Sequence, residues 1–329
     1  MQSERPWAGS RAEAADVVGG RFDVRVLEPS PPAVQDGPWF ADDPVAPGRR
    51  QDGLALLSPV RNGDLTWDDL ARAEPALAPW CADRWLGAWA ALVPIGHADA
   101  FSATREVWHA LAEHVLAPAR RAANGKIGLR ATHGGVGTPF YGHDEQARVD
   151  GTSIVVVRDG IERRRDVTTL AAAAEFVGVE PGAPRDLYEP ETHVALDAPL
   201  TVDPQAARVL GDWFGFASSV LEELRAEVGA DDARCQLWPE HFDLSIDVGD
   251  EAAGTRGTFG ASPGDAQHPG PYLYVTHWNP DVPAAAYWND TAFAGASLAY
   301  TALTAASDQR EHALAFLRRG VDTLGARRG

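Results

Sequence analysis

The chain has 329 residues, of which 45% are hydrophobic and 23% charged, as in folded proteins large enough to bury a core. Its formal net charge is −18, which repels nucleic-acid phosphates and anionic lipid head groups. We therefore expect neither a nucleic-acid nor a membrane partner. Two cysteines, Cys81 and Cys235, give no disulfide framework and no zinc ribbon.

The N-terminal residues 1–20 lack the apolar stretch of a signal peptide. The longest apolar run, residues 85–95, is shorter than the roughly 20 residues needed to cross a bilayer. We therefore expect a cytoplasmic protein. Residues 1–50 are rich in proline, glycine, aspartate and arginine, which predicts an irregular N-terminal wrap over the surface.

Residues 51–180 form the first predicted half. Residues 102–124 read as a long helix, in which Pro118 predicts a kink or a break. A strand over 126–132 and a glycine-rich loop over 133–137 follow. Asp-Gly pairs at 150–151 and 159–160 separate alternating apolar runs, the pattern of hairpin turns in a meander. A helix over 170–177 ends this half.

Residues 181–200 are rich in proline and acidic residues, and we take them as the connection to a second half, 201–329. This half begins with a helix that Asp203 caps and Gly229 ends, in which Gly211 and Gly215 predict a close contact. Strands over 234–238, 241–248, 255–260 and 271–277 follow. Helices over 292–301 and 308–324, the second capped by Ser307, complete the chain.

Both predicted halves run from helix to antiparallel strands to helix, which suggests a pseudo-duplication. The order of elements predicts an α+β fold of two packed halves, each an antiparallel sheet or meander backed by helices, and not alternating βαβ units.

From residue 201 to 324 the pattern resembles an uncharacterised bacterial family, domain of unknown function 5996. The matching stretches are the helix opened by Asp203-Pro204, Phe242-Asp243-Leu244 on a strand, Tyr272-Leu273-Tyr274 after a glycine- and proline-rich loop, and Ala315-Phe316-Leu317 in a late helix. The first half is compatible from Ile127 to Val177. The resemblance implies a fold and a bacterial cytoplasmic context, and no chemistry.

Two glycine-containing motifs suggest chemistry and fail on physical grounds. Residues 260–264 match the G-x-S-x-G pattern of serine hydrolases, but the residue after Ser262 is Pro263, which has no N–H to donate to an oxyanion. We predict that Ser262 is not a nucleophile. Residues 134–137 fit neither nucleotide-binding glycine pattern, so we expect a loop between strands.

A polar strand face is the third candidate. If residues 241–248 form a strand, its two-residue period puts His241, Asp243, Ser245 and Asp247 on one face. His277, on the predicted strand 271–277, could complete a His241/Asp243/His277 site for a divalent metal. The alternative is a hydrogen-bonded polar face that binds no metal.

The favoured function is small-molecule binding in a cleft between the halves, lined by Trp238, His241, Asp243 and Tyr274. One alternative is a metal-dependent enzyme that uses His241, Asp243 and His277. A second is a protein–protein interaction module, which an exposed tryptophan patch would favour. A divalent metal is the one cofactor considered; the ligand, the oligomeric state and whether the protein is an enzyme stay open.

Overall fold

A computed structural model gives the fold of most of the chain. The residues it describes are 57–58, 65–66, 90–132, 134–138, 145–158, 161–193, 195–228, 235–279 and 285–325. The predicted wrap over 1–50 lies outside them. The short strands β1 (Leu57–Ser58) and β2 (Leu65–Thr66) pair in parallel.

The first half begins with a long helical segment that changes its winding. It consists of helix α4 (Ala98–Leu111), a π-helical turn η1 (Ala112–Leu116) and helix α5 (Ala117–Asn124). Pro118 has no N–H to donate to the carbonyl of His114 one turn earlier. That carbonyl instead accepts the N–H of Gly182 at 3.0 Å. The helical segment thus changes to π-helical winding just before Pro118 and runs on through it without a break, and the freed carbonyl ties the helix to the connection between the halves.

The first sheet is a five-stranded antiparallel meander. Its strands are β3 (Arg130–Thr132), β4 (Gly135–Gly137), β5 (Gln146–Asp150), β6 (Ser153–Arg158) and β7 (Ile161–Asp166). The hairpin predicted at Asp150-Gly151 is confirmed, with Gly151 at φ +62°. Residues 159–160 lie outside the described residues, although Arg158 and Ile161 pair on either side of them. Helix α6 (Leu170–Val177) follows, capped by Thr169.

The glycine-rich segment 133–137 is not only a loop, because residues 135–137 form β4. A Cβ atom at Gly135 would come within 2.2 Å of the Val149 carbonyl oxygen, and one at Gly137 within 2.4 Å of the Arg148 Cβ. Glycine therefore permits this strand to lie close to β5, a packing role that the expectation of a loop did not include.

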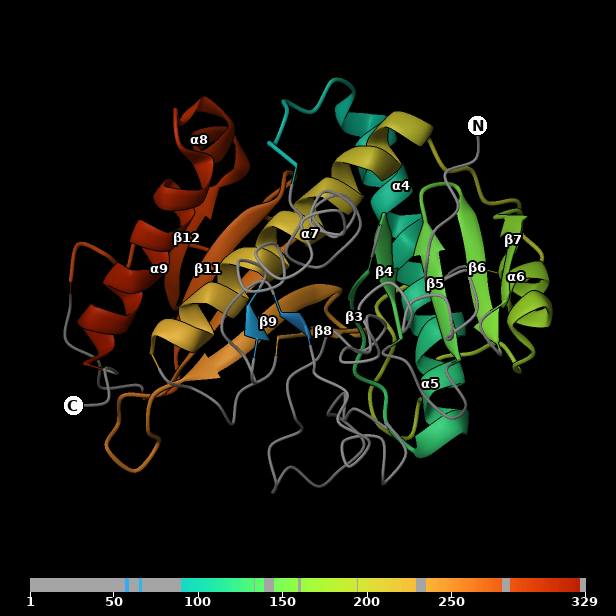
Figure 1. Cartoon of the computed structure of the whole chain (residues 1–329), viewed down its shortest axis with the longest axis horizontal. Coiled ribbons are helices and arrows are strands. Elements are labelled where there is room, and N and C mark those ends of the chain that lie inside the picture. Colours follow the sequence, from blue (N-terminus) through green and yellow to red (C-terminus); the bar gives the residue numbers. More distant parts are fainter. Residues whose placement is uncertain are drawn as a thin grey trace.

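Helix α7 (Pro204–Glu227) runs across both halves, as Figure 1 shows. Asp203 caps it by accepting the N–H of Ala206 at 2.8 Å. A Cβ at Gly211 would lie 2.9 Å from the backbone of Gly134, so the predicted close contact is confirmed at that residue. The helix also contacts β3, β4, β9 and β10, which places it in the core of both halves.

The second sheet is another five-stranded antiparallel meander. Its strands are β8 (Gln236–Trp238), β9 (Asp243–Val248), β10 (Gly257–Ser262), β11 (Tyr272–His277) and β12 (Gly295–Ala299). Helices α8 (Tyr300–Ala305) and α9 (Gln309–Leu324) end the described chain. The α+β prediction of two antiparallel sheets backed by helices is thus confirmed.

Two local predictions in this half were wrong. Residues 295–299, predicted as part of a helix, pair with β11 as strand β12, because an available sheet edge outweighs the helical preference of alanine. The cap of the last helix is Asp308, which accepts the N–H of Glu311 at 2.9 Å, and not Ser307.

The two sheets meet at their first strands. Leu129, just before β3, and Leu237, in β8, exchange two backbone hydrogen bonds of 2.8 Å. Each half contributes a long helix and a meander, followed by one helix in the first half and two in the second. The suggested pseudo-duplication stays a prediction. Among the described residues no helix combines the length and the apolar character that crossing a membrane requires.

Candidate functional site

The turn before β9 decides which side chains reach the polar face of the second sheet. Phe242 has a φ of +52°, uncommon for a residue with a side chain, and its N–H donates to the Trp238 carbonyl at 2.7 Å. Its buried ring stacks on His109, with centroids 5.1 Å apart and planes at 9°. Because the chain turns at Phe242, β9 begins at Asp243, and the prediction of a strand from residue 241 was wrong at its start.

His109 of α4 holds this turn from the first half. Its Nε2 lies 3.0 Å from the Pro239 carbonyl oxygen, which it meets as a donor. Burial lowers the pKa of His109 to about 4, so the imidazole is neutral near neutral pH. A neutral, stacked histidine thus fixes the turn that carries Glu240 and His241.

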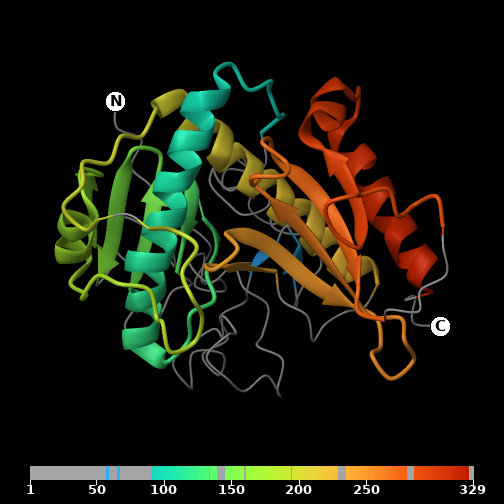
Figure 2. The same cartoon turned by 180° about the vertical axis from the view of Figure 1, so that it is seen from behind.

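The polar face of the second sheet carries three of the four predicted ligand-binding residues. Trp238 and Asp243 are direct partners across β8 and β9. The Trp238 indole N–H donates to Ser245 Oγ at 2.8 Å, and the Tyr274 hydroxyl donates to Asp243 Oδ2. Seen from behind, no described helix covers this face, whereas α7 packs on the other (Figure 2).

Gly260 makes the pairing of Asp243 and Tyr274 possible. The strand β10, which carries this glycine, lies between β9 and β11. The Tyr274 ring crosses β10 directly over Gly260, where a Cβ would lie 2.3 Å from the ring carbon Cζ. This first glycine of the G-x-S-x-G pattern is therefore explained by a close side-chain approach, and Ser262 Oγ accepts the N–H of Gly264 at 3.1 Å, as in a turn.

Two carboxyl groups at this site keep an oxygen without a hydrogen-bond partner. Among the described residues, Asp243 Oδ1 and Glu240 Oε2 are the buried carboxylate oxygens in that condition. The Asp243 residue is only 7% exposed. Burial raises the pKa of both carboxyls, the Asp243 charge raises that of Glu240 further, and the hydrogen bond from Tyr274 opposes the rise at Asp243.

A third buried carboxyl, that of Glu113 in η1, holds the connection between the two halves close to this site. It accepts the backbone N–H groups of Thr192 at 2.8 Å and Glu191 at 3.0 Å, and also the Thr192 hydroxyl. Burial and the charges of Glu113 and Glu240 raise the pKa of Tyr188 well above its usual range. The carboxyls of both halves and of the connection therefore interact electrostatically here.

Sequence reasoning missed Glu113 and Tyr188. Glu113 lies within the predicted helix 102–124, between the apolar residues Leu111 and Val115, and a charged residue in that place was the available signal. Tyr188 lies in an irregular connection and gave no signal.

Other carboxylates on the polar face are fully engaged. Asp247 accepts from Arg256 at 3.0 Å and from Thr258 at 2.8 Å. Asp265 accepts from Tyr272 at 2.6 Å, and burial, which opposes its ionisation, is outweighed by this and the backbone hydrogen bonds, so its pKa falls. The unpartnered oxygens are thus concentrated at the Asp243 end of the face.

The structure does not bring the three predicted metal ligands together. His241 lies on the turn, largely exposed, with Nδ1 3.5 Å from Glu191 Oε1. His277 pairs with Gly257, which pairs with Val248, at the far end of β9 from Asp243. That separation is about 16 Å along the strands, and His277 falls in line with residues of the opposite face. Among the described residues no group of three potential metal ligands forms. The prediction of a His241/Asp243/His277 metal site was therefore wrong.

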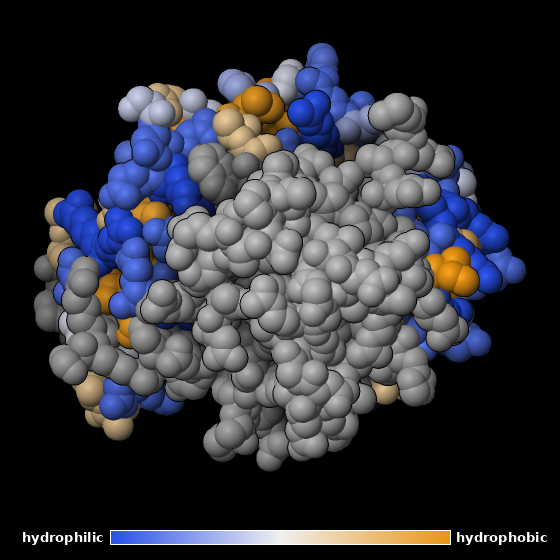
Figure 3. Space-filling model, in the orientation of Figure 1, coloured by the Kyte–Doolittle hydropathy of each residue, from blue (hydrophilic) through white to orange (hydrophobic). Residues whose placement is uncertain are grey.

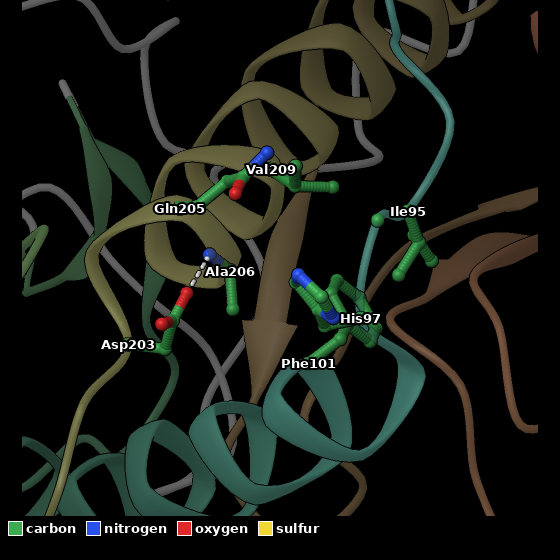
Figure 4. A pocket seen from close by; sticks show the side chains of 8 residues that line it. Ile95, His97, Phe101, Asp203, Gln205, Ala206 and Val209 are labelled. Carbon is green, nitrogen blue, oxygen red and sulfur yellow. Dashed lines mark hydrogen bonds between the residues drawn. The ribbon is translucent and has the colours of Figure 1, made fainter.

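A small pocket lies elsewhere, where α4 and α7 begin (Figure 4). Ile95, His97 and Phe101 line one side, and Gln205 and Val209 the other. The Asp203 carboxylate beside it is engaged in capping α7. Its polar groups serve the fold, and we assign it no chemistry.

We expect Asp243→Asn to stabilise the protein at about pH 8 by about 1–3 kcal/mol, since it removes a buried charge with an unpartnered oxygen. Because burial raises the folded pKa of Asp243 above 3.8, the folded state holds the proton more tightly. Stability from this group is therefore present at low pH and is lost as pH rises through the folded pKa. The gain should shrink toward about pH 4 in urea unfolding; an equal gain at both pH values would contradict the raised pKa.

Comparison of the chain with protein-family models, with curated proteins and with solved structures gives no match. The resemblance of residues 201–324 to domain of unknown function 5996 therefore stays a prediction.

Proposed function

We propose that this protein binds a small molecule where the two halves meet, at a site formed by Trp238, Asp243 and Tyr274 with His241 at its rim. The observation that supports it most is the buried Oδ1 of Asp243, which has no hydrogen-bond partner in a residue that is only 7% exposed. Leaving a buried polar atom unpaired costs about 1–3 kcal/mol, and a ligand that supplies the missing partner offsets that cost.

Two departures from regular backbone support the same location. Phe242 occupies left-handed backbone space, and its ring stacks on His109 of α4. The π-helical turn η1 directly follows α4. Both kinds of irregularity concentrate at functional sites, because only packing against the rest of the fold maintains them. The turn 239–242 contacts the connection 181–200 here, with His241 Nδ1 3.5 Å from Glu191 Oε1.

The two alternative functions have less support. The metal-dependent enzyme is disfavoured because His277 lies too far from Asp243 to share a metal ion with it. An interaction module would be favoured by an exposed tryptophan patch, yet among the described residues Trp278 is the one exposed tryptophan. The described surface in Figure 3 is mostly hydrophilic, with apolar residues in small groups.

A fragment screen by ligand-observed NMR tests the proposal. We expect fragments that bind the wild type to lose binding in Asp243→Asn and to keep it in Asp247→Asn. The control lies on the same face of β9, four residues away, but its carboxylate is already paired with Arg256. Fragments that bind all three proteins equally, or a library without a binder, would contradict the proposal.

A further inference from the structure

We infer that the ligand of this site is an organic cation, an alkylammonium group whose N–H donors meet the free oxygens of Asp243 and Glu240. The inference rests on the proposed function and deepens it by naming the ligand class.

The first support is a contrast within the molecule. Two other largely buried carboxylates pair with arginine, Glu222 with Arg225 at 2.9 Å and Glu162 with Arg148 at 2.7 Å, and the buried Glu113 is held by three hydrogen bonds. Among the described residues, no ion pair joins Glu240 or Asp243 to an arginine or a lysine, whereas both carboxyls interact with the His241 side chain on the exposed turn. A buried carboxylate without a cation is costly, and a bound cation removes that cost.

The second support is the match of donors to acceptors. Each ionised carboxylate accepts and cannot donate, whereas an ammonium group has three donors and no acceptor. Charge-assisted bonds of this kind are roughly twice as strong as neutral ones. Asp243 Oδ1 and Glu240 Oε2 are the two buried carboxylate acceptors that have no hydrogen-bond partner among the described residues. An anion would be repelled here, because Glu113, Glu191 and the net charge of −18 add to the negative potential.

The third support is the aromatic surroundings. Tyr274 is half-buried, lies on the face that carries Asp243, and has its hydroxyl engaged by that carboxylate. Trp238 lies on the same face, as the cross-strand partner of Asp243. Ammonium groups bind aromatic faces by cation–π attraction. A metal ion fits less well, since among the described residues no three potential ligands converge.

The test is an NMR titration with three ammonium probes, methylamine, butylamine and benzylamine, each beside the alcohol of the same skeleton. We expect at least one amine to bind the wild type at least about tenfold more tightly than its alcohol, a difference of about 1.4 kcal/mol. Asp243→Asn and Glu240→Gln should each weaken that amine at least about tenfold, whereas Asp247→Asn should leave it unchanged. Near-UV circular dichroism checks that every variant is folded.

Three results would overturn the inference. If each alcohol binds as tightly as its amine and Asp243→Asn abolishes both, the binding site stands and its cation preference fails. If magnesium chloride displaces the amine at equal ionic strength of sodium chloride, the site holds a metal. If no amine binds while the fragment screen finds other ligands lost in Asp243→Asn, the ligand class alone is wrong; without any such ligand, the proposed function fails as well.

Discussion

Glu113→Ala should lower the free energy of unfolding by about 3–5 kcal/mol, as expected when a buried charged acceptor is deleted and its donors stay behind. The carboxylate is fully buried and accepts three hydrogen bonds from Glu191 and Thr192. Its removal leaves these donors inside the protein without an acceptor. Guanidinium unfolding followed by far-UV circular dichroism measures the change.

Glu106→Ala is the matched control, since Glu106 lies on α4 two turns earlier and its side chain is 58% exposed. We expect that variant within about 0.5 kcal/mol of the wild type. Glu113→Gln should fall between the two, because the amide keeps one acceptor and turns its NH2 toward a donor. A Glu113→Ala variant as stable as Glu106→Ala would show that the connection does not depend on this carboxylate.

Gly260→Ala should cost about 1–3 kcal/mol, because the added methyl group occupies space that the Tyr274 ring now fills. The ring has to move, and it then loses its hydrogen bond to Asp243. Both oxygens of the buried carboxyl are left without a partner, which adds to the steric cost. Urea unfolding gives the stability, and the near-UV circular dichroism of tyrosine reports the displaced ring.

A double-mutant cycle separates the two effects. Tyr274→Phe keeps the ring over Gly260 and removes only the hydroxyl, so its cost is that of the hydrogen bond alone. If the methyl group acts by displacing the hydroxyl, Gly260→Ala in the Tyr274→Phe background should cost less than in the wild type. Fully additive costs would mean that the Tyr274 hydroxyl plays no part in the effect of the methyl group.

Much of the fold was predictable because its local signals are strong. Asp-Gly at 150–151 fixes a hairpin, the run from Asp203-Pro204 begins a long helix, and Pro118 follows a π-helical turn in another. Strand β12 was not predictable from its own residues, because Gly295–Ala299 becomes a strand through pairing with β11, a non-local cause.

The site was predictable only in part, because local alternation is visible in the sequence and strand register is not. Alternation along β9 correctly put Asp243, Ser245 and Asp247 on one face, but the left-handed turn at Phe242 removed His241 from it. The register of β11 then decides which of its side chains reaches Asp243, and periodicity alone does not give register. It selects Tyr274 and excludes His277.

The most direct measurement is the response of the Trp238 indole N–H in a two-dimensional ¹H–¹⁵N spectrum, assigned by its loss in Trp238→Phe. A bound ligand at Asp243 must alter this resonance, because the indole donates to Ser245 on the same face. We predict that fragments or amines that bind the protein shift the Trp238 signal in the wild type and no longer do so in Asp243→Asn. Ligands that bind while this signal stays fixed and the exposed Trp278 indole shifts instead would contradict a binding site at Asp243.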